Sequence, residues 1–228
     1  MSDKFNKIYE QSIKNPENFW KEASNDIFWF KRPTKILNKS NPPFYKWFED
    51  GVTNTCYNAL DVHIDKGLGK KTALIYDSPI TGKKAKFSYS NLKEKVSKFA
   101  WALKNQGINK GDRVIIYMPM IPEAVIAMLA CGRIGAIHSV VFGGFASNEL
   151  ASRIDDSKAK ILVTASCGYE PGRTVEYKPL VDKALEIAKH KPKKLILYQR
   201  DGHEVKLNGK TEISWNEALD GAQEVDCV

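Results

Sequence analysis

Paired glycines mark the first segment of this sequence that could do ligand chemistry, residues 142–147, which contain Phe142, Gly143 and Gly144. The segment follows an expected strand and opens an expected helix. Paired glycines let the backbone approach a ligand closely, and a helix N-terminus presents N–H groups to an anion. Glycines at such a junction are also typical of a simple tight turn, and locally the pattern favours that interpretation.

A second candidate segment, residues 165–174, holds two glycines, one proline and a single arginine, Arg173. It also follows an expected strand, and its composition predicts a loop with the arginine near the tip. The guanidinium group has a permanent charge and a planar fork of donors, which suits a phosphate. On local grounds, an ordinary surface arginine is the simpler interpretation.

Residues 47–63 form a third segment, with an aromatic start and Asn54 as an N-cap candidate, so a structural role is expected for it. Asp61 and His63 lie two positions apart on the expected helix. Because residues at that spacing do not face each other, we do not expect them to form an acid–base pair.

The sequence has no signature of the common catalytic and metal sites. It contains no P-loop, no dinucleotide-binding glycine fingerprint, no nucleophile elbow and no kinase motifs. Its four histidines and four cysteines have no metal-ligand spacing, so a structural zinc site is not expected. The residues by themselves predict an α/β ligand-binding scaffold without a catalytic group.

Alternating strands and helices must position the candidate segments. Apolar runs predict strands at residues 114–117, 136–142, 161–164 and 195–198, and helical periodicity predicts helices near residues 122–134, 149–156 and 178–189. This alternation predicts βαβ units and a parallel sheet. Ligands of such sheets bind beyond the carboxyl ends of the strands, which points to the segments after Tyr117, Phe142 and Thr164.

The flanking regions have patterns of their own. Residues 72–76 and 85–89 predict a hairpin, and the next helix is expected to begin at a Ser90 cap and to end at Gly107. Residues 1–50 are rich in aromatics, which predicts short helices and loops that place aromatic anchors on a larger body. The last four residues, 225–228, predict the start of another strand.

Composition limits the class of protein. The 228 residues carry a net charge of +8, but the lysines are scattered, which favours a solvated basic surface over a nucleic-acid site. The cysteines lack CxxC spacing and indicate reduced thiols. The N-terminus resembles neither a secretory signal nor an acid-free mitochondrial presequence, and no window is long enough to span a membrane. We therefore expect a cytoplasmic protein with no membrane or nucleic-acid partner.

Three ordered blocks carry a family resemblance. They are WFEDGVTNTCYNALDVHI from residue 47, MPMIPEAVIAMLACGRIGAIHSVVFGGFASNELASRIDDSKAKILVTA from residue 118, and ASCGYEPGRTVEYKPLVDKAL from residue 165. They resemble the N-terminal part of the acetyl-/propionyl-CoA synthetases, which are short-chain acyl-CoA synthetases of the adenylate-forming superfamily. The short segments NTCYNA, IYDSP, and SCG with EPGR resemble the propionyl-CoA synthetases more than the acetyl-CoA synthetases. The resemblance implies an N-terminal extension over residues 1–65 and, over residues 66–228, the truncated start of an α/β AMP-binding domain.

The resemblance also implies a ligase reaction in two steps. ATP, with Mg²⁺, and propionate or acetate give an acyl-adenylate, and CoA then takes the acyl group as a thioester. In the family, the ATP and Mg²⁺ sites and the catalytic lysine lie beyond the point where this chain ends. No catalytic residue and no metal site is therefore expected here, and the fragment by itself is expected to be inactive.

Part of the CoA site is expected within the chain. The resemblance implies that CoA contacts Glu170, Pro171, Gly172 and Arg173, together with Phe142, Gly143 and Gly144. Arg173 would meet a phosphate of CoA. Acetate enzymes usually carry an arginine where this chain has Glu170, whose carboxylate would repel a phosphate. Val62 is another departure, at a position where arginine is common.

Two other interpretations stay open. One is a non-catalytic CoA-binding or interaction protein derived from this lobe. The other is a dinucleotide-binding domain, which shares the α/β pattern but lacks the glycine fingerprint. Because an open sheet that ends at a bare strand exposes an edge, the expected partners are the missing C-terminal part or a second copy, besides CoA and a short carboxylate.

Overall fold

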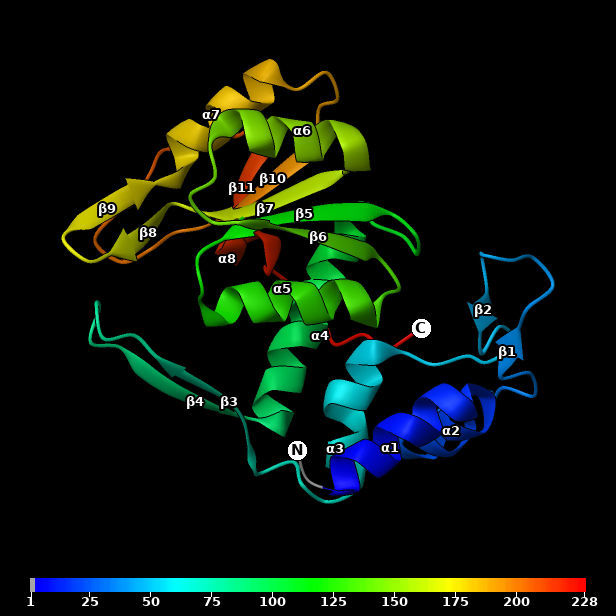
Figure 1. Ribbon diagram of the computed structural model, residues 1–228. Coiled ribbons are helices and arrows are strands. Elements are labelled where there is room, and N and C mark those ends of the chain that lie inside the picture. The colour runs from blue at the N-terminus through cyan, green and yellow to red at the C-terminus, as the bar shows by residue number, and fades with distance from the viewer. Residues whose placement is uncertain (1–2) are drawn as a thin grey trace. The chain divides into compact units, whose positions relative to one another are not determined.

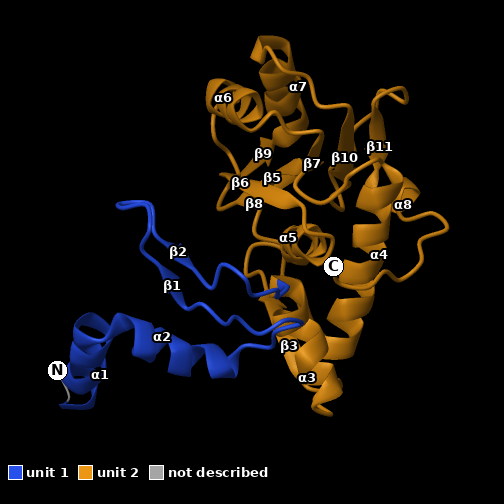
Figure 2. Cartoon of the chain, turned by 90° about the vertical axis from the view of Figure 1, so that its right-hand side faces the viewer, with its two compact units in different colours: residues 1–54 blue, residues 55–228 orange. Residues whose placement is uncertain are grey.

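A computed structural model describes residues 3–228, and the chain forms two compact units (Figure 2). The first unit ends at Asn54 and the second begins at Thr55. Within the described residues, every helix is too short or too polar to cross a membrane.

The first unit consists of short helices and a small ribbon. Its elements are α1 (Asp3–Lys14), α2 (Pro16–Ala23), the 3-10 turn η1 (Ser24–Asp26), and the antiparallel strands β1 (Leu37–Asn38) and β2 (Lys46–Trp47). Asn15 caps α2 by accepting a hydrogen bond from the N–H of Asn18, and Pro16 stands in the first turn, where its missing donor costs nothing. The expectation of short helices and loops is confirmed.

Aromatic side chains of the first unit contact one another. Trp20 meets Trp47 edge-on with ring centroids 6.3 Å apart, and Trp29 packs on Phe48 with centroids 5.5 Å apart. Other rings stay in solvent, and Phe44 keeps an exposed fraction of 75%. That these rings anchor the unit on a larger body stays a prediction.

The second unit is built on a five-stranded parallel sheet (Figure 1) with the strand order β11-β10-β7-β5-β6. Its strands are β5 (Arg113–Met118), β6 (Ile137–Phe142), β7 (Ile161–Ala165), β10 (Lys194–Tyr198) and β11 (Glu212–Ser214). The four expected strands are confirmed. The fifth, β11, escapes prediction because three residues after a polar loop are too few for a periodic pattern.

Helices cover both faces of this sheet (Figure 1). They are α4 (Tyr89–Asn105), α5 (Pro122–Arg133) and α8 (Trp215–Ala218) on one face, and α6 (Ser147–Ser157) and α7 (Tyr177–Ile187) on the other. The helices on each face form a hydrophobic core with the sheet, and strand β5 contributes to both cores. Ile116 faces α4 and α5, whereas Ile115 and Tyr117 face α6 and α7. Because parallel strands are covered on both faces, they appear in the sequence as continuous apolar runs.

Capping residues and a glycine mark the ends of the helices on the α4–α5 side of the sheet. A helix over residues 55–65 includes the π-helical stretch η2 (Tyr57–Asp61) and the turn α3 (Val62–Asp65), and Asn54 precedes it as expected. Helix α4 differs from the prediction, because Ser88, not Ser90, accepts the capping hydrogen bond from the N–H of Asn91. Gly107 follows α4 at a φ of 86°, a conformation that favours glycine.

Two hairpins of the second unit stand outside its main sheet. The first pairs β3 (Thr72–Asp77) with β4 (Lys84–Ser88), as predicted. The second pairs β8 (Cys167–Glu170) with β9 (Arg173–Glu176), so the prediction of a loop over residues 165–174 is wrong, although Arg173 does lie next to the tip. The reason lies in the turn, where Pro171 fixes one backbone angle and Gly172 adopts a positive φ of 73°, which closes a two-residue hairpin loop.

The expected strand at residues 225–228 is also wrong. The segment has no regular secondary structure and joins no sheet. The N–H of Val225 donates to Oγ of Ser97 at 2.6 Å, and the N–H of Val228 donates to the carbonyl of Arg133 at 3.0 Å. These partners on α4 and α5 take the backbone hydrogen bonds that a neighbouring strand would otherwise accept.

Candidate functional site

A cavity of about 360 Å³ opens at the carboxyl ends of the parallel strands. We call it the strand-end cavity. Its wall comes from the β3–β4 hairpin, the segments after β5 and β6, hairpin β8–β9 and the start of α7. It lies where the ligand rule for parallel sheets places a binding site. The lining residues are Tyr76, Asp77, Ser78, Pro79, Ile80, Met118, Pro119, Met120, Ile121, Val140, Val141, Phe142, Gly143, Gly168, Tyr169, Glu170, Tyr177 and Arg200.

The two candidate segments of the sequence meet at this cavity. Phe142 and Gly143 come from the end of β6, and Glu170 comes from the end of β8. Four other predicted residues are not part of its wall: Gly144, Pro171, Gly172 and Arg173. The structure therefore brings three of the seven predicted residues onto one cavity and leaves Arg173 at the tip of the neighbouring hairpin.

Tyr177, the first residue of α7, holds the two segments together. A Cβ atom on Gly143 would lie 2.3 Å from the Tyr177 hydroxyl oxygen, and one on Gly168 would lie 2.8 Å from the same atom. Tyr177 is only 4% exposed, and burial raises the pKa of its hydroxyl to about 12. Both glycines are thus required by close packing, and Gly144 is required by its positive φ of 95°.

Arg173 is paired with Glu170, a charged residue of its own hairpin. Its Nε donates to Glu170 Oε2 at 2.7 Å, and its Nη2 lies 2.6 Å from the same oxygen. The two residues face each other across the Pro-Gly turn, so the hairpin register creates the pair. Both side chains are exposed, at 71% for Arg173 and 43% for Glu170, so the pair is weak and can be exchanged for a stronger partner.

Arg200 is a site residue that the sequence analysis missed. Its exposed fraction is 8%, and its guanidinium carbon lies 5.0 Å from the centre of the Tyr169 ring, a cation–π arrangement. Among the described residues its guanidinium forms no ion pair, although it lines the strand-end cavity. The signal was available, because Arg200 follows β10 and the strand-end rule applies to that strand as well.

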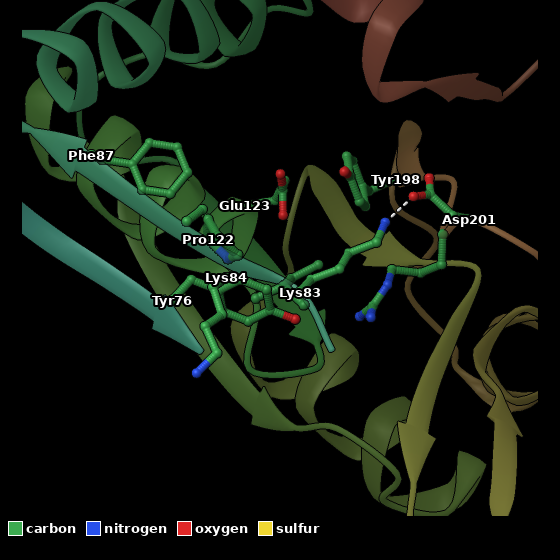
Figure 3. A pocket seen from close by; sticks show the side chains of 11 residues that line it. Tyr76, Lys83, Lys84, Phe87, Pro122, Glu123, Tyr198 and Asp201 are labelled. Atoms are coloured by element: carbon green, nitrogen blue, oxygen red, sulfur yellow. Dashed lines mark hydrogen bonds and ion pairs between the residues drawn. The ribbon is translucent and has the colours of Figure 1, made fainter. Parts of the chain in front are cut away.

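Figure 3 shows a second cavity, of about 290 Å³. Its wall shares Tyr76, Ile121 and Arg200 with the strand-end cavity. Its other lining residues are Lys83, Lys84, Ala85, Phe87, Pro122, Glu123, Tyr198 and Asp201. Lys83 and Asp201 form an ion pair that links the β3–β4 hairpin to the segment after β10 (Figure 3). Burial raises the pKa of the Glu123 carboxyl, while hydrogen bonds from its own backbone N–H and from Tyr198 oppose this rise.

Asp61 and His63 serve different partners, as their spacing predicts. Asp61 Oδ2 accepts a hydrogen bond from Arg133 Nη1 at 2.8 Å, whereas the His63 ring packs against Tyr89 with centroids 4.7 Å apart. The two residues do not form an acid–base pair, and neither lines the strand-end cavity.

Comparison with family profiles shows to which family the chain belongs. The profile of the family described as "AMP-binding enzyme" matches residues 63–226, and that described as "Acetyl-coenzyme A synthetase N-terminus" matches residues 5–59. The chain belongs to the AMP-binding enzyme family. Its resemblance to short-chain acyl-CoA synthetases, inferred from the three sequence blocks, is confirmed.

Two curated relatives of this AMP-binding family member are named as acyl-CoA or acetyl-CoA synthetases. The chain is 53% identical over 221 residues to "Acyl-CoA synthetase short-chain family member 3, mitochondrial" of Rattus norvegicus, with 96% of this chain and 32% of the relative covered. It is 45% identical over 216 residues to "Acetyl-coenzyme A synthetase" of Streptomyces coelicolor, with 93% and 32% covered. The chain therefore spans about a third of the length of the curated relatives it matches.

A solved structure supports the fold of this family member. Acetoacetyl-CoA synthetase from Streptomyces lividans superposes with a TM-score of 0.84 at 21% identity, and covers 96% of this chain and 33% of the other. At this identity the likeness concerns the fold, and it agrees with the α/β architecture expected from the sequence. The expected boundary at residue 65 stays a prediction.

Proposed function

We propose that this chain is the N-terminal portion of a propionate–CoA or acetate–CoA ligase, which uses ATP and Mg²⁺ to form an acyl-adenylate and then transfers the acyl group to CoA. Membership of the AMP-binding family and the acyl-CoA synthetase relatives support the reaction class. Propionate is preferred as substrate because the short segments NTCYNA, IYDSP and EPGR resemble the propionyl-CoA synthetases more than the acetyl-CoA synthetases. We assign no catalytic residue and no metal ligand of the ligase reaction to these 228 residues.

We further propose that CoA binds at the strand-end cavity and along the neighbouring hairpin tip. The observation that carries this proposal is the meeting of Phe142, Gly143 and Glu170 on one cavity wall, although the two segments are distant in sequence. In this arrangement Gly144, Pro171 and Gly172 give a phosphate close access to the backbone. Arg173 then supplies the positive charge at the hairpin tip.

The missing part of the ligase is the proposed partner of this chain, with a second copy as the alternative. The edge strand β6 supports a partner, because Ile137, Val140 and Phe142 are all more than half exposed there. We propose a cytoplasmic location from the four cysteines, which are thiols typical of a reducing compartment. The rat relative is named as a mitochondrial protein, so localisation of the tagged protein is the direct test.

Arg173→Ala is expected to weaken CoA binding by about 10- to 100-fold, because a charge-assisted hydrogen bond is worth about 1.5–3 kcal/mol. Calorimetric titration of the chain with CoA measures this change. Arg153→Ala is the matched control, since Arg153 is an exposed arginine on α6 outside the cavity wall. Equal CoA affinity of wild-type protein and R173A would contradict the proposed site. A loss that disappears with dephospho-CoA would place Arg173 on the 3′-phosphate, and a loss that persists would place it on the diphosphate.

Glu170→Gln is expected to tighten CoA binding by about two- to fivefold. The substitution removes a negative charge beside the proposed phosphate and releases Arg173 from a pair that is worth at most about 1 kcal/mol. The same titration, repeated at high salt, should show a smaller gain because screening weakens exposed charges. Weaker binding by E170Q would show instead that Glu170 holds Arg173 in the orientation that CoA requires.

The alternative function is a non-catalytic CoA-binding protein. The two functions are distinguished by an activity assay on a polypeptide that contains this chain together with the proposed missing part of the ligase. Release of AMP that depends on propionate, ATP and CoA supports the ligase, whereas CoA binding without AMP release supports the alternative.

A further inference from the structure

Two cysteines, one carboxylate and two cations form a cluster at the side of the α4–α5 core. We call it the Arg133 cluster; it consists of Cys56, Asp61, Lys93, Arg133 and Cys227. Arg133 Nη1 lies 3.6 Å from Cys56 Sγ, 3.2 Å from Cys227 Sγ and 2.8 Å from Asp61 Oδ2. The two sulfur atoms and a carboxylate oxygen all lie within 4.8 Å of one another.

Three separate parts of the chain supply this cluster. Cys56 lies on the helix over residues 55–65, Arg133 is the last residue of α5, and Cys227 belongs to the irregular segment 222–228. Arg133 also fixes that segment, because its Nε donates to the carbonyl of Val225 at 2.6 Å. The fold thus holds two thiols side by side that are distant in sequence.

The Arg133 cluster has an excess of positive charge, which stabilises one additional negative charge within it. Arg133 and Lys93 contribute two positive charges, and Asp61 contributes one negative charge. The side chain of Arg133 is 1% exposed and that of Asp61 is 9% exposed, so water compensates little of the difference. A single thiolate shared by the two sulfur atoms would make the cluster neutral, because nearby cations stabilise the ionised form of cysteine.

A metal ion does not fit the same atoms. Arg133 Nη1 lies within 3.6 Å of both sulfur atoms and of the carboxylate, in the space that a bound cation would need. The guanidinium group therefore already supplies the positive charge at this position.

We propose that Cys56 and Cys227 form a dithiol site that reacts with hydrogen peroxide and closes to a disulfide. The thiolate sulfur of Cys56 attacks one peroxide oxygen, the O–O bond breaks, and the departing hydroxide takes a proton to give water. The Cys227 sulfur then attacks the sulfenic sulfur, the S–O bond breaks, and the leaving hydroxide takes the thiol proton as a second water. Two thiols are oxidised, and one peroxide is reduced to two waters.

The environments of the cysteines agree with these roles. A hydrogen bond from Cys227, followed by the Arg133 guanidinium, lowers the pKa of Cys56 although burial opposes the change. Cys131 shows the opposite case, because burial in an apolar core raises its pKa to about 12. Cys131 is therefore expected to stay an unreactive thiol under the same conditions.

Peroxide can reach the site from two directions. Cys227 is partly exposed. Cys56 is fully buried, but it belongs to the wall of a cavity of about 510 Å³ that Val125, Met128, Ile137 and His138 also line. The disulfide would tie the helix over residues 55–65 to the C-terminal segment, and thiol reductants would release it.

The test treats the purified chain with one equivalent of hydrogen peroxide, blocks the remaining thiols with N-ethylmaleimide, and maps the products by non-reducing peptide mass spectrometry. We expect a linked peptide pair that contains Cys56 and Cys227, loss of two of the four thiols, and recovery with dithiothreitol. Cys131→Ser should give the same product. Cys227→Ser should leave a sulfenic acid at Cys56 that dimedone traps. Retention of all four thiols, or a link that involves Cys131 or Cys167, would overturn the proposal.

A second variant tests the charge argument without disturbing either cysteine. Lys93 lies 3.6 Å from Asp61 Oδ1 and its side chain is 30% exposed, so Lys93→Gln should fold. We expect K93Q to slow the loss of the two thiols by about three- to tenfold, because it removes one of the two positive charges of a poorly solvated cluster. Lys95→Gln, at an exposed position on the same helix, is the control and should leave the rate unchanged. Equal rates for K93Q and K95Q would refute the thiolate that the proposal requires.

Discussion

Asp61→Asn is expected to lower the free energy of unfolding of the chain by about 3–5 kcal/mol, because it leaves a buried guanidinium without its carboxylate. Arg133 donates to both oxygens of Asp61, at 2.8 Å from Nη1 and 3.0 Å from Nη2, and neither side chain has appreciable contact with water. The pair also joins the helix over residues 55–65 to the end of α5, so its loss should loosen the contact between them. Urea unfolding followed by circular dichroism measures the change, with the slope of the transition checked for each variant.

Two comparisons separate a buried charge from a general effect of removing an aspartate. Asp77→Asn removes an exposed partner of Lys84 and should cost less than about 1 kcal/mol. Adding Arg133→Met to Asp61→Asn removes the uncompensated charge and should restore part of the lost stability. A cost below about 1 kcal/mol for D61N, similar to that of D77N, would show that the pair contributes no more than a surface ion pair.

Gly143→Ala is the substitution expected to affect both the fold and the proposed CoA site. The added methyl group would lie 2.3 Å from the hydroxyl oxygen of Tyr177 and 2.9 Å from the carbonyl oxygen of Met118. Because both neighbours are held by the packed core, relief requires the tyrosine ring and the β6 turn to move apart. Overpacking of this kind costs about 1–3 kcal/mol, and the displaced wall should weaken CoA binding measured by calorimetry.

Gly209→Ala is the matched control for this prediction, since a Cβ atom there would have no heavy atom within 4 Å and the backbone has no positive φ. Tyr177→Phe in the Gly143→Ala background removes the hydroxyl oxygen but leaves the Met118 carbonyl contact, so a partial recovery of stability is expected. If G143A unfolds at the same urea concentration as G209A, the close packing of Tyr177 against Gly143 does not constrain the site.

Both predictions concern residues that hold segments together. Arg133 connects a helix, the end of α5 and the C-terminal segment, and Tyr177 connects the β6 turn to hairpin β8–β9. The proposed CoA wall depends on the second of these connections. The proposed dithiol depends on the first, so the same arginine that stabilises the fold also sets the charge around Cys56.

Much of the architecture follows from local patterns. The apolar run of β5 predicts a strand because a strand covered on both faces must be apolar at consecutive positions, and Pro122 predicts the first turn of α5 because the missing donor costs nothing there. The glycine pair after β6 is also a local signal, since two adjacent glycines by themselves predict a turn. The family resemblance likewise depends on runs of neighbouring residues and needs no contact between distant ones.

What the sequence by itself determined is therefore the order of four strands of the parallel sheet and of the helices between them, the family and the segments that could bind a ligand. Only the tertiary structure decided which distant residues meet: Tyr177 with Gly143, Arg200 with the other residues of the cavity wall, and Arg133 with Cys56 and Cys227. The physical reason is the sequence separation over which each kind of interaction acts. Periodicity and turn propensity act over a few neighbouring residues, whereas these contacts join segments that approach only when the sheet and its helices have packed.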